Sequence, residues 1–544
     1  MKLKRTPLVT LIALLVLLLT IFRPVHTGAA TKPVPQFVVI SEIAWMGTTN
    51  SPTHEWIELY NKPVNGPINL TGWTLQAADG TPSIALSGII PAGGYFLLER
   101  TNDGSVPGVA ADQIYTGALG NNGEHLLLYD SSSTLIDEVD CAGGWYAGHD
   151  RARVPMVRVD TYLPGTDPSN WTYNPRCGTA TNSAGATYEC PYTVYSTSDP
   201  LYYAVYFNER ATTASGPTIQ PTAMENALLD LIDRATTSID IALYGLNRQS
   251  VVDALIAAHN AGVTVRVVGD DEAATSAEYG ASYQALTNAG ITIVTDTSLS
   301  KIQHNKFLVL DGSVVWTGST NLTDTCLTLN ANSSIAITDT VLAGSYTAEF
   351  EEMWAGSFSG DKTVNTIQHL DYGGTLVESY FSPTDWPAFE VWLELAKAEE
   401  TIHFAMFFWT DELLSRRVME RLRAGVEVYG VWDQLGASNV ASQDELLCAA
   451  GARIGIENLP GKVHHKFAVI DVEGDDPVVI VSSYNWTEAG AYDNDENTLI
   501  IHDHELARAY YAEWQRLWAT VPEDRVCEAV RVYLPVVQNG YTSP

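Results

Sequence analysis

The stretch His304-Asn305-Lys306-Phe307-Leu308-Val309-Leu310-Asp311 decides the fold, because it returns as His464-His465-Lys466-Phe467-Ala468-Val469-Ile470-Asp471, 160 residues later. Each copy has the pattern His-x-Lys-x-x-x-x-Asp and is followed by Ser-x-Asn. One copy would arise by chance in a chain of this composition with a probability of roughly one or two percent, so alone it is weak evidence. Two copies indicate that a single active site is built from two halves.

Lysine is rare in this chain, and its distribution singles out the two motifs. The chain has ten lysines, with none between Lys62 and Lys301. Four of the ten, Lys301, Lys306, Lys462 and Lys466, lie within three residues of a motif histidine. Compact cations beside titratable imidazoles suit the binding and cleavage of a phosphodiester. The alternative interpretation is a solvated charged loop near two core histidines.

The repeat extends beyond the motifs. Residues 238–244 (Ser-Ile-Asp-Ile-Ala-Leu-Tyr) recur at an offset of 163 as residues 401–407 (Thr-Ile-His-Phe-Ala-Met-Phe). In both halves strand-like runs alternate with helical patterns, which predicts an α/β sandwich with pseudo-twofold symmetry. The motif histidines are expected to meet at the interface of the halves. We assign residues 201–360 to a first repeat, 361–378 to a connector, 379–521 to a second repeat and 522–544 to a C-terminal tail.

The length and the N-terminal sequence limit the class of protein. A chain of 544 residues that is 46% apolar supports about three domains with large cores. Residues 1–30 are typical of a secretory signal, with Lys2, Lys4 and Arg5 before the apolar stretch 8–22 and small residues up to position 30. We therefore expect an exported protein, extracellular or at the cell surface. A retained anchor is the alternative, although 15 apolar residues are few for a span of about 20.

The chain is strongly acidic. Its formal charge of −34 becomes −38 once the four cations of residues 1–30 are removed, because that segment contains no acid. Such acidity disfavours broad wrapping of nucleic acid, whose binding depends on many phosphate contacts from Lys and Arg. An acidic insert, residues 473–477, is expected to form a surface hairpin turn that would repel polyanions if it overhangs the pocket.

The cysteine pattern predicts disulfides and no metal site. The six cysteines show no Cys-x-x-Cys and no His-Cys clustering at zinc spacing, so neither a metal nor a cofactor is expected. At least two disulfides are expected in an exported chain, with Cys177 and Cys190 as the favoured pair. Fifteen full connectivities remain open. The cysteines are Cys141, Cys177, Cys190, Cys326, Cys448 and Cys527.

Residues 36–160 alternate short apolar runs with clusters of Gly, Pro, Asn and Asp, which predicts a small β-sandwich. The runs at 40–43, 55–61, 70–75 and 91–95 resemble the lamin-tail domain. The resemblance implies an immunoglobulin-like sandwich without catalytic residues, and a cell-surface ligand for it stays open. We interpret Glu42, Glu55 and Glu58 as structural or adhesive positions. Residues 161–200, which contain Cys177 and Cys190, are interpreted as a linker.

The two motifs, together with residues 318–321 (Gly-Ser-Thr-Asn) and 482–485 (Ser-Ser-Tyr-Asn), resemble the phospholipase D superfamily. The resemblance covers residues 201–521. It implies a metal-independent phosphodiesterase, but the superfamily includes phospholipases, nucleases and phosphatidyl transferases, so the substrate is less defined than the reaction. One departure is Ser482, where a glycine is usual.

The chemistry assigns roles to the residue types. Two-step displacement through a phosphohistidine needs one nucleophilic imidazole and one proton donor. Charge on the nonbridging oxygens needs fixed donors, and Ser319 and Ser483 would brace the site. Asp311 and Asp471 complete the motif set, although orienting the loop suits them better than proton transfer. The donors are Lys306, Lys466, Asn321 and Asn485, with Lys301 and Lys462 as further substrate-binding cations.

The two halves differ beside the histidines. Glu496 follows the second motif and is expected to pair with His464, whereas the matching residue of the first half, Asn332, would lie beside His304. A carboxylate favours a protonated imidazole. This assigns His464 as the general acid and His304 as the nucleophile.

The leading functional hypothesis is an exported phospholipase D-type hydrolase that releases a phospholipid headgroup. Aromatic residues near the motifs, including Tyr244, Phe407, Phe408 and Trp409, line an acyl or headgroup channel in this hypothesis, although plain core is the commoner role. One alternative is an exported nuclease of the same superfamily. Another is a surface adhesion protein with a degenerate hydrolase half, which the completeness of both motifs disfavours.

Overall fold

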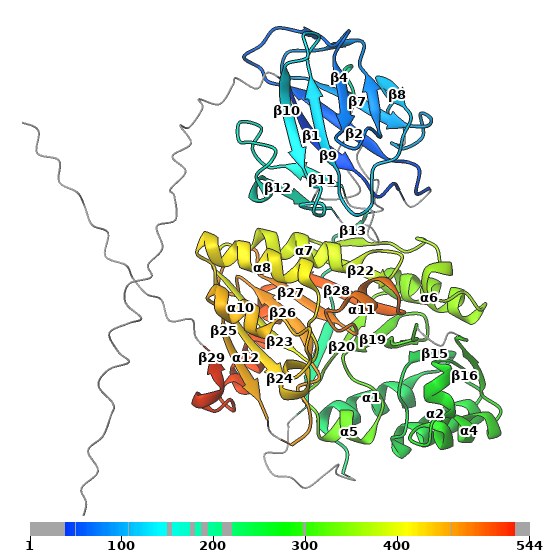
Figure 1. Ribbon diagram of the computed structural model, residues 1–544. Helices are drawn as coiled ribbons and strands as arrows, with labels where there is room; N and C mark the ends of the chain where they lie inside the picture. The colour runs from blue at the N-terminus through cyan, green and yellow to red at the C-terminus, as the bar shows by residue number, and fades with distance from the viewer. Residues whose placement is uncertain are drawn as a thin grey trace, which may run out of the picture. The chain divides into compact units, whose positions relative to one another are not determined.

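The computed structural model describes residues 38–48, 51–106, 108–148, 155–173, 180–186, 194–208, 220–297, 301–458 and 460–527. Two predictions lie outside these residues: the signal segment 1–30 and the Cys177–Cys190 pair. The chain divides into two compact units, Met1–Tyr188 and Glu189–Pro544 (Figure 1). Among the described residues, no helix is both long and apolar enough to cross a membrane.

The first unit is a β-sandwich. Its elements are β1 (Val38–Ala44), β2 (Trp56–Asn61), β3 (Ile68–Asn69), β4 (Thr74–Ala77), β5 (Ser83–Ala85), β6 (Ile89–Ile90), β7 (Tyr95–Arg100), β8 (Gln113–Tyr115), β9 (His125–Tyr129), β10 (Leu135–Asp140), β11 (Met156–Arg158), η1 (Pro168–Asn170) and β12 (Trp171–Tyr173). One sheet has the order β12-β11-β1-β2-β7-β8 and the other β10-β9-β4-β5. Apolar side chains from both sheets, such as Ile40 and Leu128, form one core.

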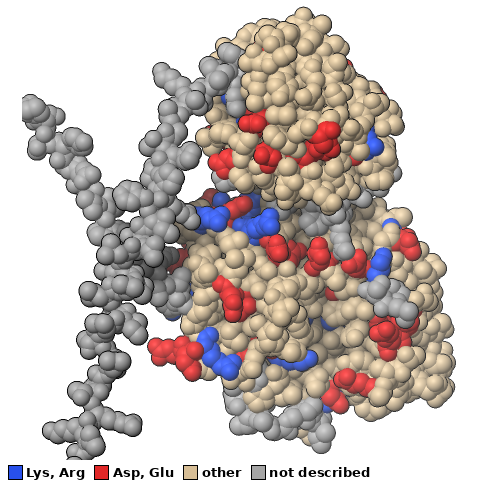
Figure 2. All heavy atoms as spheres, viewed as in Figure 1, with Lys and Arg blue, Asp and Glu red and all other residues tan. Residues whose placement is uncertain are grey.

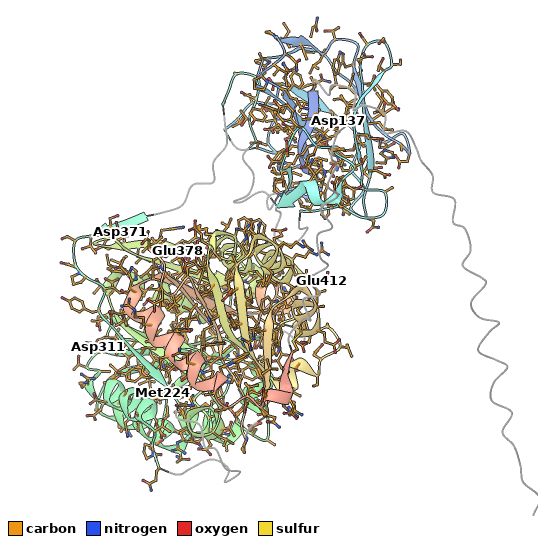
Figure 3. The ribbon with its side chains drawn as sticks, turned by 90° about the vertical axis from the view of Figure 1, so that its left-hand side faces the viewer. Asp137, Met224, Asp311, Asp371, Glu378 and Glu412 are labelled. Carbon is orange, nitrogen blue, oxygen red and sulfur yellow. A yellow bond between two sulfur atoms is a disulfide. The ribbon has the colours of Figure 1, made fainter. Side chains whose placement is uncertain are left out.

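The sandwich extends further along the chain than the sequence predicted. Strand β12, at residues 171–173, pairs with β11 and so belongs to the sheet, although we had placed it in the linker. Arg158 on β11 forms a fully buried ion pair with Asp137 on β10, at 2.6 Å, which ties the two sheets together. Asp137 is labelled in Figure 3. Glu55 and Glu58 are also buried; the first pairs with Arg100 and the second accepts a hydrogen bond from Ser41, as their structural interpretation requires.

The second unit carries both repeats. Its strands are β13 (Val194–Thr197), β14 (Tyr203–Phe207), β15 (Ser238–Leu243), β16 (Thr264–Gly269), β17 (Thr292–Thr295), β18 (Lys306–Leu310), β19 (Val314–Gly318), β20 (Ser333–Thr338), β21 (His369–Tyr372), β22 (Thr375–Ser382), β23 (Thr401–Met406), β24 (Glu427–Asp433), β25 (Arg453–Glu457), β26 (Lys466–Ile470), β27 (Val478–Ser482), β28 (Glu496–His502) and β29 (Val526–Cys527). Its helices are α1 (Ala223–Arg234), α2 (Gln249–Asn260), α3 (Asp271–Thr275), α4 (Gly280–Asn288), α5 (Asp324–Thr328), α6 (Thr340–Trp354), α7 (Pro387–Lys397), α8 (Glu412–Ala424), α9 (Gln434–Ala437), α10 (Asp444–Ala450), α11 (Glu488–Tyr492) and α12 (His504–Trp518), with the 3₁₀ turns η2 (Ser359–Asp361) and η3 (Glu523–Arg525).

The two repeats share one sheet topology. The first sheet has the order β14-β20-β19-β18-β15-β16-β17, and the corresponding strands of the second run β22-β28-β27-β26-β23-β24-β25. The second sheet is longer in the described residues, because β13 and β21 extend one edge and β29 the other. Strand β21 lies in the predicted connector and β29 in the predicted tail. The predicted pseudo-twofold α/β architecture is confirmed.

Strand residues alternate between two cores, because successive side chains point to opposite faces of a sheet. Phe307 and Val309 of β18 pack into a core shared by both sheets, together with α6 and α12. Leu308 and Leu310 face the other way, onto α1, α2 and α4. The sheet of the first repeat is therefore covered on both faces, which explains why its central strands are continuous apolar runs.

Equivalent aspartates begin the two central helices. Asp339 accepts a hydrogen bond from the backbone N–H of Leu342 at the start of α6, and Asp503 does the same for Leu506 at the start of α12. A side-chain cap of this kind typically stabilises a helix by about 1 kcal/mol. The caps fix where the helices that fill the shared core begin.

A disulfide joins the end of the described chain to the second repeat. Cys448 on α10 and Cys527 on β29 are bonded across a sequence separation of 79 residues, while Cys141 and Cys326 are buried free thiols. We expect the Cys448→Ser/Cys527→Ser double variant to lose about 2 to 4 kcal/mol of unfolding free energy in urea. Cys141→Ala is the control, because it removes a buried thiol without a bridge. Peptide mapping that finds free thiols at both positions in protein from an oxidising compartment would contradict the assignment.

Candidate active site

The sheet topology brings both motifs to one end of their sheets. Lys306 opens β18 and pairs with Leu243 at the end of β15, so His304 lies beside the segment that follows β15. Lys466 opens β26 and pairs with Met406 at the end of β23 in the same way. The antiparallel neighbours β19 and β27 end at the same edge and deliver the Ser-x-Asn segments there.

Each motif is hydrogen-bonded to the opposite repeat. The backbone N–H of His304 donates to the carbonyl of Asp495 at 2.9 Å, and the N–H of Asp495 donates back to Ile302 at 3.0 Å. In the other half, the N–H of His464 donates to the carbonyl of Ala331 at 2.9 Å. The segment that leads into β28 therefore lies along the first motif, and the segment that leads into β20 lies along the second.

This exchange corrects the predicted histidine partners. Nδ1 of His304 lies 2.7 Å from Oε1 of Glu496, and both residues are buried. We had paired Glu496 with His464 because the two share a repeat. The carboxylate reaches across instead, because it follows Asp495, which is hydrogen-bonded to the first motif. Ser483 donates a 2.6 Å hydrogen bond to the other oxygen, Oε2, and so holds the carboxylate in place.

His464 has amide and carbonyl partners instead. Its Nδ1 lies 2.9 Å from Oδ1 of Asn332 and 3.1 Å from the carbonyl of Ser319. The amide group of Asn332 donates to the carbonyl of Cys326 at 3.0 Å, and the Ser319 hydroxyl donates to Oδ1 at 3.0 Å, which fixes the oxygen toward the ring. Both imidazoles therefore donate from Nδ1 to an acceptor in the opposite repeat. This leaves Nε2 of each ring for chemistry.

Burial and the lysines control the charge of the site. Burial lowers the pKa of His304 to about 4, with Glu496 opposing the shift. The pKa of His464 is held well below its usual range by burial and then by the charges of Lys466 and Lys306. Burial also lowers the pKa of Lys306 to about 8 and brings that of Lys466 well below its ordinary value. Without substrate, the lowered pKa values favour the neutral form of both imidazoles.

Two family models match the chain. The model of the family "Cardiolipin synthase, PLD-like domain" matches residues 228–354 and 392–518, and that of the Lamin Tail Domain matches residues 31–143. The chain contains two phospholipase D-like domains. It therefore combines two phospholipase D-like repeats with a lamin tail domain at its N-terminal side, as the sequence resemblances implied.

Relatives match over single-repeat lengths. The human mitochondrial cardiolipin hydrolase is 34% identical over 124 residues, which cover 23% of this chain and 48% of that protein. A phospholipase D of Rickettsia felis is 31% identical over 121 residues, or 22% of this chain and 58% of that protein. The phospholipase D family member Nuc from Salmonella typhimurium shares 29% identity over 28% of this chain and 96% of its own, with a TM-score of 0.25. The chain spans about half the length of the curated relatives it matches.

The remaining predicted donors of the phospholipase D site lie at the same edge. Lys306 and Lys466 direct Nζ back to the carbonyls of His304 and His464, at 2.5 and 2.8 Å. Lys462 is exposed, and its Nζ lies 5.1 Å from the centre of the Phe407 ring, which itself packs against His464. Oδ1 of Asn321 and Oδ1 of Asn485 have no hydrogen-bond partner within the described residues. Lys301 is half-buried in the segment that leads into His304.

Aromatic side chains flank the two histidines symmetrically. Tyr244 packs edge-on against His304, with ring centres 5.2 Å apart, and Phe407 lies 5.0 Å from His464. These two positions correspond in the repeats. Trp409, Tyr484 and Trp486 are fully buried, so they belong to the core. Of the predicted aromatic residues, Tyr244, Phe407 and the half-buried Phe408 remain candidates for substrate contact.

The motif aspartates lie away from the phospholipase D site, which corrects their place among the catalytic candidates. Asp311 follows the far end of β18 and accepts hydrogen bonds from the backbone N–H groups of Thr236, Thr237 and Ser238 (Figure 3). Although partial burial opposes it, these bonds hold the pKa of Asp311 well below its usual range. Asp471 accepts from three consecutive N–H groups before β23 in the same way. Both carboxylates organise the loop before a central strand.

We expect Asp311→Ala to reduce stability and to leave catalysis nearly unchanged. Leaving the three backbone N–H groups without their charged acceptor should cost about 1 to 3 kcal/mol, measured by urea unfolding. The kcat measured well below the unfolding transition should change by less than about threefold. Asp311→Asn is the matched control, because asparagine tolerates the positive φ of 50° and keeps one acceptor. A large fall in kcat with unchanged stability would return Asp311 to the catalytic set.

A buried lysine supports the first histidine, and this role was not predicted from the sequence. Nζ of Lys362 is fully buried, lies 2.8 Å from Oδ1 of Asp495 and pairs with Glu349. Asp495 is the residue whose carbonyl accepts the His304 N–H. The available sequence signal for Lys362 was that lysine is rare, because the chain has only ten lysines. Nothing in its sequence surroundings connects it with the motif.

Proposed function

We propose that this chain is an exported phospholipase D-type hydrolase that cleaves the headgroup phosphodiester of a phospholipid through a phosphohistidine intermediate. The observation that carries the reaction is the paired orientation of the imidazoles, each with Nδ1 held by an acceptor and Nε2 free for the substrate. Two matched imidazoles beside two buried lysines supply a nucleophile, a proton donor and anion stabilisation together.

The first step forms the covalent intermediate. Nε2 of His304 attacks phosphorus, the bond to the leaving oxygen breaks, and His464 transfers a proton from Nε2 to that oxygen. Glu496 accepts the Nδ1–H of His304 and offsets the positive charge that the ring acquires. A bound phosphodiester anion offsets the lysine charges that lower the pKa of His464, so proton uptake by His464 accompanies substrate binding.

The second step releases the product. His464, now neutral, takes a proton from water as the oxygen attacks phosphorus, and the bond between phosphorus and Nε2 of His304 breaks. After the product leaves, His464 releases this proton to solvent, which balances the proton taken up on substrate binding and returns both rings to their starting charge. Lys306 and Lys466 are the cations placed to stabilise the nonbridging oxygens in both steps.

Charge and the aromatic residues support a phospholipid substrate. The chain carries a formal charge of −34, and acidic side chains are spread over the face shown in Figure 2. A long polyanion gains little on such a surface, whereas a lipid presents one phosphodiester beside apolar chains. Tyr244, Phe407 and Phe408 offer apolar contacts beside the histidines. Several relatives are named as cardiolipin hydrolases or phospholipases D.

Export is supported by two features. The first 30 residues have the composition of a secretory signal, and Cys448 and Cys527 form a disulfide, which is typical of oxidising compartments.

A parallel assay tests the substrate. Purified protein lacking residues 1–30 is incubated with phosphatidylcholine vesicles, cardiolipin vesicles, single-stranded DNA and duplex DNA, each with and without EDTA. We expect phosphatidic acid from at least one lipid, retained in EDTA, and no cleavage of DNA. The His304→Ala variant controls for contaminating hydrolases. DNA cleavage without lipid turnover would replace the proposal by a nuclease.

A further inference from the structure

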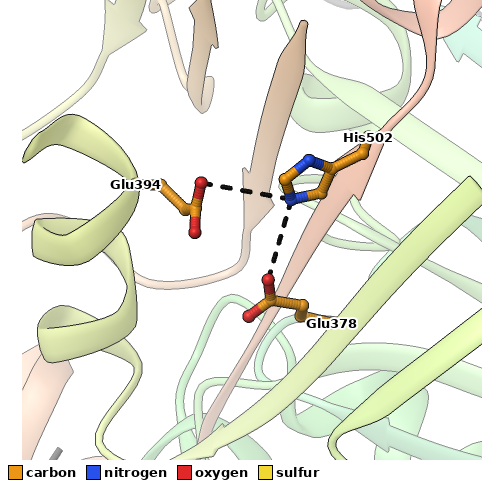
Figure 4. Close-up of side chains that lie close together, drawn as sticks. All are labelled: Glu378, Glu394 and His502. Carbon is orange, nitrogen blue, oxygen red and sulfur yellow. Dashed lines mark ion pairs between the residues drawn. The ribbon is translucent and has the colours of Figure 1, made fainter. Parts of the chain in front are cut away.

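A second cluster of titratable side chains lies in the second repeat, apart from the histidine motifs. Glu378 on β22, Glu394 on α7 and His502 at the end of β28 converge there, as Figure 4 shows. His502 ends the strand that Glu496 begins. The two lie six positions apart along the extended strand, about 20 Å at roughly 3.3 Å per residue. The cluster is therefore distinct from the hydrolytic site.

The distances in the cluster are too long for hydrogen bonds. Nε2 of His502 lies 3.7 Å from Oε1 of Glu378 and 4.0 Å from Oε2 of Glu394. Neighbouring ligands of a tetrahedral zinc ion, bound at about 2.0 to 2.2 Å, are separated by roughly 3.3 to 3.5 Å. The three atoms all lie within 4.8 Å of one another, so small side-chain movements would place them around one cation.

Two of these atoms are buried without a hydrogen-bond partner among the described residues. Nε2 of His502 and Oε2 of Glu394 have no hydrogen-bond partner within the described residues, and Glu394 is only 2% exposed. Buried polar atoms are normally hydrogen-bonded, because an unsatisfied one costs about 1 to 3 kcal/mol. Both atoms point into the same space (Figure 4). A cation in that space would satisfy both.

The other polar atoms of the cluster are already held by neighbours. Nδ1 of His502 is 2.9 Å from Oδ1 of Asp476, which directs the lone pair of Nε2 toward the two glutamates. Oε1 of Glu394 pairs with Lys397 at 2.5 Å, and Oε2 of Glu378 accepts a hydrogen bond from Tyr380. A carboxylate that orients a metal-binding histidine through its second nitrogen is a common feature of metal sites.

The acidic insert, which the hydrolytic mechanism does not use, supplies this outer carboxylate. Asp476 belongs to residues 473–477, and it lines a cavity of about 470 Å³ together with Glu394, Glu473, Asp475 and Glu400. The cavity opens beside Glu394 and is rich in carboxylates. It therefore gives a cation an attractive route to the cluster.

We propose that Glu378, Glu394 and His502 bind one divalent transition-metal ion, with Zn²⁺ preferred, and that the ion stabilises the second repeat. One imidazole and two carboxylates match the ligand types of zinc, and two carboxylates balance its charge within a buried site. The ion would join β22, α7 and β28, which otherwise meet here through mutually repelling acids. The proposal is independent of the hydrolytic function, since no catalytic residue takes part.

The competing interpretation is a protonated His502 that neutralises the carboxylates alone. Burial opposes protonation, but Glu378 and Asp476 raise the pKa of His502 overall. In that case the cluster would be complete without a metal. The two interpretations differ in stoichiometric metal binding and in the response of stability to Zn²⁺.

Metal titration of the full mature chain distinguishes them. Protein stripped with EDTA is titrated with Zn²⁺ by calorimetry, and thermal unfolding is followed at several Zn²⁺ concentrations. We expect one Zn²⁺ per chain and a rise in Tm of about 3 to 8 °C at one hundred times Kd. Glu394→Gln and His502→Gln should weaken binding by more than about 100-fold, and Asp476→Asn by about 10- to 100-fold. His504→Gln, at an exposed histidine two residues away, should bind normally.

The metal-dependent change in Tm is compared within each variant, so a variant that is less stable without metal still gives a result. No calorimetric signal and no Tm response in the parent chain would overturn the proposal, as would equal binding by His502→Gln and the parent. Loss of binding in His504→Gln alone would assign the ion to the surface. Hydrolysis by the stripped protein at low temperature is expected to persist, which separates this site from catalysis.

Discussion

His304→Ala should abolish both turnover and the covalent phosphoenzyme. With no imidazole at this position, no phosphohistidine can form, whatever the leaving group. Phosphohistidine hydrolyses in acid, so we would quench the reaction at alkaline pH. The labelled peptide is then mapped by mass spectrometry. We expect label on the peptide containing His304 in the parent chain and none in the variant, with turnover of phospholipid reduced to the background.

His464→Ala should behave differently, because it removes a proton donor and leaves the nucleophile. A natural alkoxide leaving group needs that proton, and its loss commonly costs a factor of about 100 to 10,000. A nitrophenyl phosphodiester has a leaving group that departs unprotonated, so adduct formation should persist. Because the pKa of His304 is about 4, the nucleophile is neutral above that pH, and adduct formation from the nitrophenyl substrate should be nearly constant from pH 5.5 to 7, below the pKa of about 8 of Lys306.

Label on the peptide containing His464, or equal losses on both substrates in both variants, would reverse or remove this division of roles. Circular dichroism and Tm of each variant serve as folding controls, since both histidines are buried. The result does not depend on the lipid chosen, because the nitrophenyl substrate reports on the nucleophile alone.

The fold could be predicted from the sequence because its signals are local or repeated. The repeated segments 238–244 and 401–407 contain the equivalent strands β15 and β23. The apolar run 307–310 forms the rest of β18 after Lys306. Each of these signals depends on a few consecutive residues. The strand β12 was missed, because its three residues lie among Thr, Ser, Pro and Asn typical of a linker.

The histidine partners could not be predicted, because their pairing depends on contacts between repeats. Glu496 is nearer in sequence to His464 than to His304, and sequence distance favoured the wrong partner. Only the hydrogen bonds of Asp495 to the first motif and of Ala331 to the second show that the segments are exchanged. The cluster of Glu378, Glu394 and His502 escaped prediction for a related reason, since its members lie on three separate elements.

Glu496→Gln tests the exchanged pairing directly. If Glu496 serves His304, the variant loses the charge that stabilises the positive ring, and its amide can present N–H to Nδ1 and so enforce the unreactive tautomer. We expect adduct formation from the nitrophenyl substrate and turnover of phospholipid to fall together, by about 100- to 10,000-fold. The measurement is the single-turnover rate on both substrates.

Asn332→Ala is the matched variant at the equivalent position of the other repeat. It should keep adduct formation from the nitrophenyl substrate within about threefold, because His304 retains Glu496. Turnover of phospholipid should fall only about tenfold, since the carbonyl of Ser319, 3.1 Å from Nδ1 of His464, still accepts a hydrogen bond from that ring. If each acceptor instead served the histidine of its own repeat, we would expect the opposite result. Glu496→Gln would then keep adduct formation from the nitrophenyl substrate, and Asn332→Ala would lose it. The nitrophenyl substrate therefore decides which histidine each acceptor serves.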